Sequence, residues 1–438
     1  MDRANFIVQC LSNVDQVNIN EGIAKHKKMA TSPFIFFRGS APLFYADIKA
    51  GNLVIPDALN CIPNTTIIGD CHTSNFGFLT EEGSHGDKVI FSPNDFDDAC
   101  IAPAAWDLAR FITSLFLAIE HCKLVKANQI ESKKDYSNKQ LATKPHAQEA
   151  ASAFLNDYIA TCQACIDDES YRYKALSTFQ TEHILHKPLM KASQRSAFGK
   201  DFLTKSALAK AIKITGNRIT FIDNAEKFVA LSKDEYEGIN ATFRPYVDDH
   251  IHDIVLRINA GTGSVNMSRY YLLVGPKQNP SNQLNLCHVV EVKQQRKAAP
   301  LYYFEELSPV NQLNAAHLTA NCQRRMQRSP DLVLDEVEWK ASHWLIRSRH
   351  HAKLGINPEQ IGLGKKAVAL GGLIDYAKTC GVALALAHCR GDRRSTLFEQ
   401  TTVDCLPEQK NILIEHCKSY AQQVIEDTNF LNNLLVNN

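Results

Sequence analysis

The chain has 438 residues, of which 45% are hydrophobic and 22% charged, and its formal net charge is +1. This is the composition of an ordinary globular protein, and the length is sufficient for two lobes. The near-zero charge excludes a global field that would recruit nucleic acid or a membrane surface, so any phosphate binding must be local.

No apolar run reaches the roughly 18 residues of a membrane span, and the first residues lack a secretory signal pattern. The 13 cysteines are scattered, and the one Cys-x-x-Cys pair, Cys162 and Cys165, lies inside an expected helix without a second pair. We therefore expect reduced thiols and a cytoplasmic protein. Delivery by a specialised secretion system would leave no mark in this pattern.

Residues 1–30 have a helical pattern, which we expect Pro33 to end. Three phenylalanines follow, at 34, 36 and 37, and we expect them in the core. Arg38 then needs a partner or water at the end of this aromatic run. It is either a structural ion pair or a cation aimed at a phosphate or at an acidic cluster.

Two short apolar runs, 65–68 and 88–91, are typical of buried strands, and each ends in an acidic turn. If a short loop joins the two strands, Asp70, Asn75 and Asp95 meet at the same rim. Oxygen ligands of this kind suit a Mg²⁺ ion that holds nucleotide phosphates. The alternative is a pair of ordinary polar turns, since Asp and Asn favour turns.

Residues 102–120 predict a buried amphipathic helix with Asp107 in its first turn. Asp107 either caps this helix or accepts backbone N–H groups of the Asp70 loop. We expect an exposed connection over 123–147 and helices near 148–168 and 202–213. The intervening segment, 169–200, is basic and irregular, and its pattern assigns it no structure.

A second block begins near residue 252, where three strands are expected, the last being 288–295. Gly261, Gly263 and Ser264 form a turn between the first two strands, and Lys293 lies near the end of the third. Glycines allow backbone N–H groups to approach phosphates, and Lys293 could add a charge. A plain hairpin and a solvated lysine are the alternative. The turn precedes a strand and not a helix, which argues against both a Rossmann site and a Walker loop.

Further on, 305–327 predicts a helix whose Glu305, Glu306 or Gln323 could brace Lys293. One strand is expected over 337–347. An alanine-rich helix, 371–390, has the small residues that suit close helix packing, and a last helix covers about 407–436. The chain shows no internal repeat.

The first block resembles the catalytic half of the aminoglycoside phosphotransferase and choline kinase branch of the protein-kinase-like fold. The resemblance is carried by Gly69-Asp-Cys-His-Thr-Ser-Asn75, Asp95-Phe-Asp97 and Trp106-Asp-Leu-Ala109. The glycine turn and Val290-Glu-Val-Lys293 resemble the nucleotide lobe of the same fold. The order of the two halves is reversed, as in a circular permutation. Most of the chain also resembles the bacterial domain of unknown function 2252 family, although Asn266 and Gln294-Gln295 depart from the pattern expected there.

The resemblance implies an α+β, two-lobed, kinase-like fold with permuted order. Residues 1–214 would form the catalytic part, 215–350 a small antiparallel sheet with a helix, and 351–438 helices that return to the catalytic part. It implies ATP and Mg²⁺ as cofactors, with Asp70 as the base and Asn75 and Asp95 as metal ligands. Gly261, Gly263, Ser264 and Lys293 would hold phosphates. Supporting roles fall to Arg38, His72, Asp97 and Asp107, and Asp97 with Asp98 either binds a second metal or solvates the turn.

Three functions remain open. The first is phosphoryl transfer from ATP to a hydroxyl group of a small molecule or a protein. The second is AMP transfer by an enzyme of the same fold, and the third is a non-catalytic nucleotide-binding protein. An acceptor-facing Asp70 favours the first two, because a binding module has no need of one. The sequence identifies neither the acceptor nor the oligomeric state.

Overall fold

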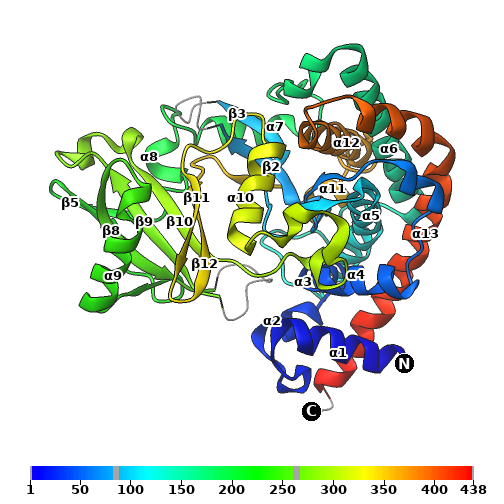
Figure 1. Ribbon diagram of the computed structural model, residues 1–438, viewed down its shortest axis with the longest axis horizontal. Helices are drawn as coiled ribbons and strands as arrows, with labels where there is room; N and C mark the ends of the chain where they lie inside the picture. The colour runs from blue at the N-terminus through cyan, green and yellow to red at the C-terminus, as the bar shows by residue number, and fades with distance from the viewer. Residues whose placement is uncertain (1, 82–87, 260–266, 437–438) are drawn as a thin grey trace.

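A computed structural model describes residues 2–81, 88–259 and 267–436 of the chain. It is a mixed α+β protein, as expected. Figure 1 shows a twisted antiparallel sheet on one side of the molecule, a group of helices on the other, and α10 (Ala315–Met326) between them. No helix in the described ranges is long and apolar enough to cross a membrane.

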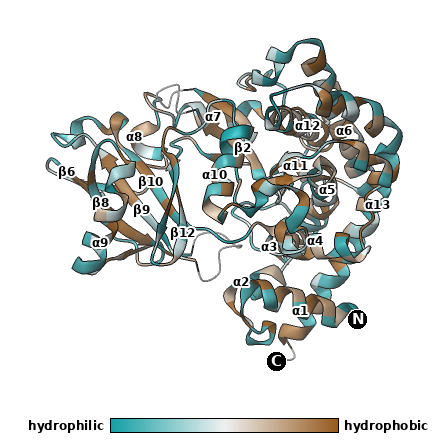
Figure 2. Cartoon of the chain, viewed as in Figure 1, coloured by the Kyte–Doolittle hydropathy of each residue, from teal (hydrophilic) through white to brown (hydrophobic). Residues whose placement is uncertain are grey.

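The helical part is built around α5 (Ala104–Lys126), which is buried on nearly every side. It packs against α6 (Lys144–Asp167) and α13 (Leu397–Val436), and α6 packs closely against α12 (Gly372–Gly391). A Cβ at Gly381 would lie 2.3 Å from the carbonyl oxygen of Phe154, so glycine is required for this approach. Apolar residues concentrate on the facing sides of these helices (Figure 2). The remaining helices of this part are α1 (Arg3–Asp15), α2 (Ala24–Met29), α3 (Pro33–Gly39), α4 (Ala41–Ala50), α7 (His186–Ser193) and α11 (Pro358–Gly362).

Two small antiparallel sheets hold the acidic turns. In the first, β1 (Thr65–Ile67) pairs with β4 (Cys100–Ala102). In the second, β2 (Phe76–Thr80) pairs with β3 (Val89–Pro93) and with β13 (Leu354–Gly355). The turn from β1 to β2 and the turn from β3 to β4 therefore lie side by side.

The larger sheet has six antiparallel strands in the order β11-β12-β10-β9-β8-β7. Alternate residues of its strands face opposite sides. Tyr271 and Leu273 pack toward the β5–β6 hairpin, whereas Leu272 and Val274 pack toward α9. The elements of this part are α8 (Phe202–Lys205), β5 (Ile212–Thr215), β6 (Arg218–Phe221), β7 (Phe228–Ala230), α9 (Lys233–Phe243), β8 (His250–Arg257), β9 (Arg269–Gly275), β10 (His288–Gln294), β11 (Leu334–Trp339) and β12 (Ser342–Arg349).

Several local predictions were wrong. Pro33 begins α3 instead of ending a helix, because its fixed φ suits a first helical turn. The expected helix over 202–213 is the short α8, then turns, then the start of β5. The strand expected over 337–347 is a hairpin that turns at Lys340 and Ala341, both with positive φ.

The cysteines are a partial exception to the expectation of reduced thiols. Cys61 and Cys405 are paired through their Sγ atoms, with Cα atoms 7.6 Å apart. This separation is wider than the roughly 4.4–6.8 Å usual for disulfides. The other eleven cysteines are free and buried.

Candidate functional site

The turn that follows β1 is fixed by the helix that comes after it in the chain. The carboxylate of Asp107, in the first turn of α5, accepts the backbone N–H groups of Ile68 at 2.7 Å and of Gly69 at 3.0 Å. His388 of α12 lies 3.1 Å from the same carboxylate. Tyr45 donates its hydroxyl to the carbonyl of Gly69. Hydrogen bonds on both sides therefore hold this backbone still, as expected for Asp107.

Gly69 brings the two acidic turns into contact. Its φ is +78°, and a Cβ there would lie 1.9 Å from the carbonyl oxygen of Asp98. Only glycine combines this backbone conformation with so close an approach. The sequence between β1 and β2 thus fixes the position of the turn between β3 and β4.

Asp70 is held by an arginine that the sequence reading missed. Nε and Nη2 of Arg110 donate to Asp70 Oδ1 at 2.8 and 2.6 Å, and Nη2 also donates to the carbonyl of Phe37. Arg110 is completely buried, with its guanidinium over the rings of Phe37 and Phe44. The Asp70 side chain is 20% exposed. One carboxylate oxygen is therefore fixed, and the carboxylate still reaches solvent.

His72 lies beside the second oxygen of Asp70. Burial, together with Arg38 and Arg110, holds the pKa of His72 well below 6.5, so its ring is neutral at pH 7. Its Nδ1 accepts the backbone N–H of Ser74 at 3.2 Å. The ring proton must then be on Nε2, which lies 3.6 Å from Asp70 Oδ2.

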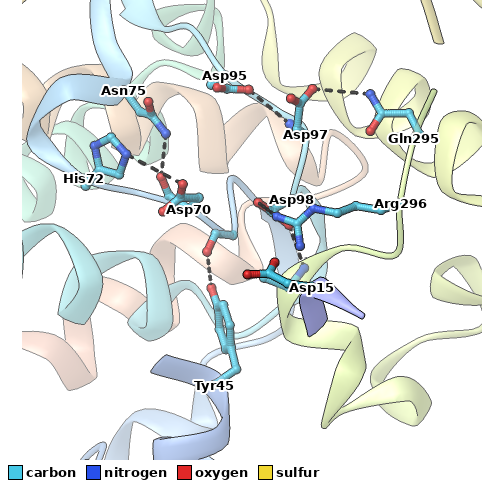
Figure 3. A network of polar contacts seen from close by, with 12 residues as sticks. Asp15, Tyr45, Asp70, His72, Asn75, Asp95, Asp97, Asp98, Gln295 and Arg296 are labelled. Atoms are coloured by element: carbon cyan, nitrogen blue, oxygen red, sulfur yellow. Dashed lines mark hydrogen bonds and ion pairs between the residues drawn. The ribbon is translucent and has the colours of Figure 1, made fainter. Parts of the chain in front are cut away.

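Asn75 and Asp95 face the same space as Asp70 (Figure 3). The amide nitrogen of Asn75 donates to the carbonyl of Asp70 at 2.8 Å, which leaves its amide oxygen as the atom able to bind a ligand. Asp95 Oδ1 accepts the backbone N–H of Asp97 at 3.4 Å. Burial, and then the charge of Asp97, raise the pKa of Asp95. A nearby cation would therefore stabilise its charged form.

Asp97 connects this turn to the large sheet. It forms an ion pair with Lys293 of β10, and it also lies 3.3 Å from the amide of Gln295 and 3.5 Å from Arg347 of β12. Burial alone would raise the pKa of Asp97, but Lys293 and Arg347 outweigh it and hold the pKa well below 3.8. Asp97 is thus ionised at neutral pH.

Asp98 makes a second connection between the same parts. Its Oδ1 accepts the backbone N–H of Ala299 at 2.8 Å, and its Oδ2 lies 3.4 Å from Arg296. These contacts fix the segment that follows β10 (Figure 3). Asp98 is therefore used for structure, which leaves Asp95 as the less encumbered carboxylate of this turn.

Glu291, two residues before Lys293 on β10, gathers three arginines of the sheet. Arg347 donates at 2.9 Å and Arg269 at 3.2 Å, and Arg349 lies 3.9 Å away. Burial would raise the pKa of Glu291, but the arginines, Arg347 first, hold it well below 4.5. The sheet thus presents a cluster of fixed cations to the acidic turns.

These groups line one cavity of about 210 Å³ between the sheet and the helical part. Arg38 points into it with a buried Nε that has no hydrogen-bond partner, and Asp70 and Asp95 are the nearest opposite charges. Within the described ranges no carboxylate pairs with Arg38, so the structural ion pair considered from the sequence is not formed. The ionisable residues of the lining are Arg38, Asp70, His72, Asp95, Asp97, Asp98, Arg269, Glu291, Lys293, Arg296, Asp331, Arg347, Arg349, His350 and Lys353.

The donor set is compatible with Mg²⁺ that also binds phosphate oxygens. Such an ion takes one or two carboxylates and few other protein ligands. Asn75 and Asp95 supply an amide and a carboxylate oxygen at the cavity. Among the described residues, no three His, Cys, Asp or Glu side chains are grouped to hold a metal by themselves. Any metal here would depend on a ligand for the rest of its coordination.

A family model described as an uncharacterized protein conserved in bacteria (DUF2252) matches residues 21–432. The chain belongs to the DUF2252 family. No curated protein and no solved structure matches it. Arguments about chemistry in this DUF2252 protein therefore come from its own residues.

The partner of Lys293 differs from the one that the sequence predicted. Glu305, Glu306 and Gln323 were the expected partners, but Asp97 takes that place. Glu305 pairs with Lys297, and Gln323 bonds to other groups. The expected phosphate-binding residues Gly261, Gly263 and Ser264 lie outside the described residues. Met267, just beyond them in the DUF2252 chain, lines the cavity.

Arg110, Glu291 and Arg347 were missed by the sequence reading. Arg110 occurs within a strongly apolar helix pattern, three residues after Asp107. A charged residue at a buried helical position needs a partner, and this was the available signal. Glu291 similarly alternates with buried valines on β10. Nothing in the sequence indicated that Arg347 would reach the acidic turn.

Proposed function

We propose that this protein is an ATP- and Mg²⁺-dependent phosphotransferase that acts on a hydroxyl group of a small molecule or a protein. One observation supports this most strongly. A single cavity contains Asp70, Asn75 and Asp95 from the first part of the chain and Lys293 from the large sheet. This is the combination of a base, metal ligands and a phosphate-binding cation that phosphoryl transfer requires.

The nucleotide phosphates would lie against the cationic side of the cavity. Lys293 has three N–H donors, so it can keep its pair with Asp97 and still donate to a phosphate oxygen. Arg38, which also lines the cavity and has an unpaired Nε, would add a second cation. In this proposal Gly261, Gly263 and Ser264, which come between β8 and β9 in the sequence, add backbone N–H groups.

The metal would be held by the amide oxygen of Asn75 and the carboxylate of Asp95. When bound, Mg²⁺ and ATP supply the phosphoryl group and neutralise its developing charge. Asp97 is an alternative ligand, but its ion pair with Lys293 already neutralises it. We therefore assign Asp97 to the support of Lys293.

Asp70 would position the acceptor hydroxyl and receive its proton. Its Oδ1 is fixed by Arg110, and its Oδ2 remains available at the cavity. The His72 ring beside Oδ2 is neutral, so it adds no positive charge that would compete for the Asp70 carboxylate. Charge neutralisation and positioning would supply most of the rate acceleration, with the proton transfer contributing about 10²–10⁴-fold.

The arrangement supports a two-lobed kinase-like fold in permuted order as part of this proposal. The acidic turns and helices come first in the chain, and the antiparallel sheet with Lys293 comes later. α12 and α13 then return to the helical part. The reversed order changes the connections but not which groups meet at the cavity.

Labelled ATP tests the reaction. Purified protein is incubated with Mg²⁺ and either γ-labelled or α-labelled ATP, together with candidate acceptors and without them. Transfer of the γ label supports the proposal, whereas transfer of the α label means AMP transfer. If Mg-ATP causes neither transfer nor a thermal shift, both catalytic versions and the nucleotide-binding alternative are wrong.

The metal assignment has its own test. Asp95→Asn should lose the Mg²⁺-dependent part of ATP binding, measured by calorimetry with and without a chelator. Asp404→Asn, at an exposed position of α13, is the matched control and should bind like the wild type. Equal nucleotide affinity in the wild type and Asp95→Asn would contradict the assignment.

A further inference from the structure

Residues 187–213, which include the end of the unassigned stretch 169–200 and the expected helix 202–213, have a charge unlike that of the whole chain. The full chain has a net charge of +1, but residues 187–213 contain six lysines and one arginine against a single aspartate. Local charge of this density needs a use or a partner, because like charges repel. The seven cations are Lys187, Lys191, Arg195, Lys200, Lys205, Lys210 and Lys213.

These cations lie close enough to one another to interact. Burial and then Arg195 lower the pKa of both Lys191 and Lys210, and Lys205 contributes to each. Lys133 and Lys134, from the connection before α6, join the same group. Lys191, Arg195, Lys205 and Lys210, together with Lys133 and Lys134, therefore form one basic surface.

Few acids neutralise this surface. Lys205 pairs with Asp201 at 3.1 Å, and Lys213 pairs with Asp223. Across the described ranges, the remaining lysines of the segment have no ion pair. Most of its charge is therefore available to an anionic partner.

An exposed phenylalanine lies between Arg195 and Lys200 in the basic segment. Phe198 is 74% exposed and has a φ of +65°, a strained conformation for a bulky residue. Hydrogen bonds fix the turn around it, from the backbone N–H of Gly199 to Ser196 O at 2.9 Å and from that of Asp201 to Gln194 O at 2.8 Å. An ordered turn thus holds this side chain out in water, which is the kind of local strain found at functional positions.

α7 and α8 of the same segment carry further exposed apolar side chains. Leu203 of α8 is 66% exposed and Met190 of α7 is 47% exposed. Leu203 also borders a groove whose lining is mainly aliphatic and includes Ile214 and Leu284. Exposed apolar groups inside a basic surface suit a partner that is anionic outside and apolar beneath.

From these observations we infer that α7, α8 and the Phe198 turn form a docking surface for an anionic lipid bilayer. The lysines attract the anionic headgroups, and Phe198, Leu203 and Met190 insert at the boundary with the acyl chains. A single-stranded nucleic acid would require several aromatic stacking positions. Here Phe198 is the one exposed aromatic residue of the described segment 187–213.

Vesicle sedimentation tests the inference, with the full chain and without nucleotide, so the result is independent of the proposed reaction. The vesicles are phosphatidylcholine alone or phosphatidylcholine with roughly one third phosphatidylglycerol. We expect binding to the anionic vesicles only. The triple variant Lys200→Gln/Lys205→Gln/Lys210→Gln should bind at least tenfold more weakly, since each lysine near an anionic surface contributes roughly fivefold.

Phe198→Asn tests the apolar part, because asparagine tolerates positive φ and so preserves the turn. It should remove the binding that persists at high salt. The matched control, Lys28→Gln/Lys49→Gln/Lys233→Gln, removes three exposed lysines outside the surface and should bind like the wild type. The inference is overturned if the wild type does not bind anionic vesicles or binds neutral vesicles equally well. It is also overturned if both triple variants lose the same vesicle affinity, or if the protein binds only a soluble polyanion such as single-stranded RNA.

Discussion

Lys293 of β10 forms an ion pair with Asp97, which precedes it by 196 residues. Both side chains are largely buried, so removing either one leaves the charge of the other in a poorly solvated position. It joins the sheet to the acidic turn at the candidate site. The relative position of the two parts of the molecule therefore rests partly on this contact.

A double-mutant cycle should detect the contact. Asp97→Asn leaves the buried Lys293 charge without its partner and should cost about 3–5 kcal/mol of unfolding free energy. Lys293→Met should cost less, because Asp97 keeps Arg347 at 3.5 Å. The double variant should be less destabilised than the sum of the two, because no unpaired partner remains. Urea unfolding measures all four proteins. Additive losses would mean that the two side chains do not interact in solution.

Asp70→Asn should separate binding from turnover. The amide cannot take the hydroxyl proton, so the transfer rate should fall by about 10²–10⁴-fold. Mg-ATP affinity should remain close to that of the wild type, because Asp70 is not among the proposed metal ligands. Single-turnover kinetics and calorimetry check the two parts. Full activity in this variant would remove Asp70 from the mechanism.

Gly69→Ala should be strongly destabilising. The new Cβ would meet the carbonyl of Asp98 at 1.9 Å on a backbone with φ of +78°. Strain and overlap together should cost about 3–5 kcal/mol. Gly51→Ala is a matched control with φ of +75° and no atom within 4 Å of its Cβ, so only about 1–2 kcal/mol is expected. Equal losses in thermal unfolding would show that the two turns do not touch.

Glu291→Gln should lower stability in a pH-dependent way. The pKa of Glu291 is lower in the folded protein than its ordinary 4.5, so its contribution is complete above pH 4.5. That contribution decreases as the pH falls below 4.5 toward the folded value. The variant should therefore unfold at a lower temperature than the wild type at pH 7, and the difference should narrow below pH 4.5. Glu338→Gln, an exposed change on β11, should show neither effect. A constant difference across this range would contradict the ion cluster.

The sequence predicted the parts of the site that depend on local pattern. Strands β1 and β3, each followed by an acidic turn, were visible because short β-branched runs bounded by Asp and Asn are a local signal. Asp107 was also recognisable, since an acid in a first helical turn has only a few uses. Lys293 was correctly placed near the end of a strand.

The sequence could not supply the pairings through space. The choice of Asp97 as the partner of Lys293 depends on how the sheet lies against the turns, and the candidates chosen were neighbours in sequence. Lys340 and Ala341 form a turn with positive φ at both positions, although neither residue type favours it, so the β11–β12 hairpin read as one strand. Tertiary packing outweighs local preference at such positions.

The most direct test of the central claim is a crystal structure with Mg²⁺ and a non-hydrolysable ATP analogue. We expect the metal on the oxygens of Asn75 and Asp95, phosphates within reach of Lys293, and the terminal phosphate facing Asp70. A nucleotide bound elsewhere, or a metal that avoids both Asn75 and Asp95, would contradict it.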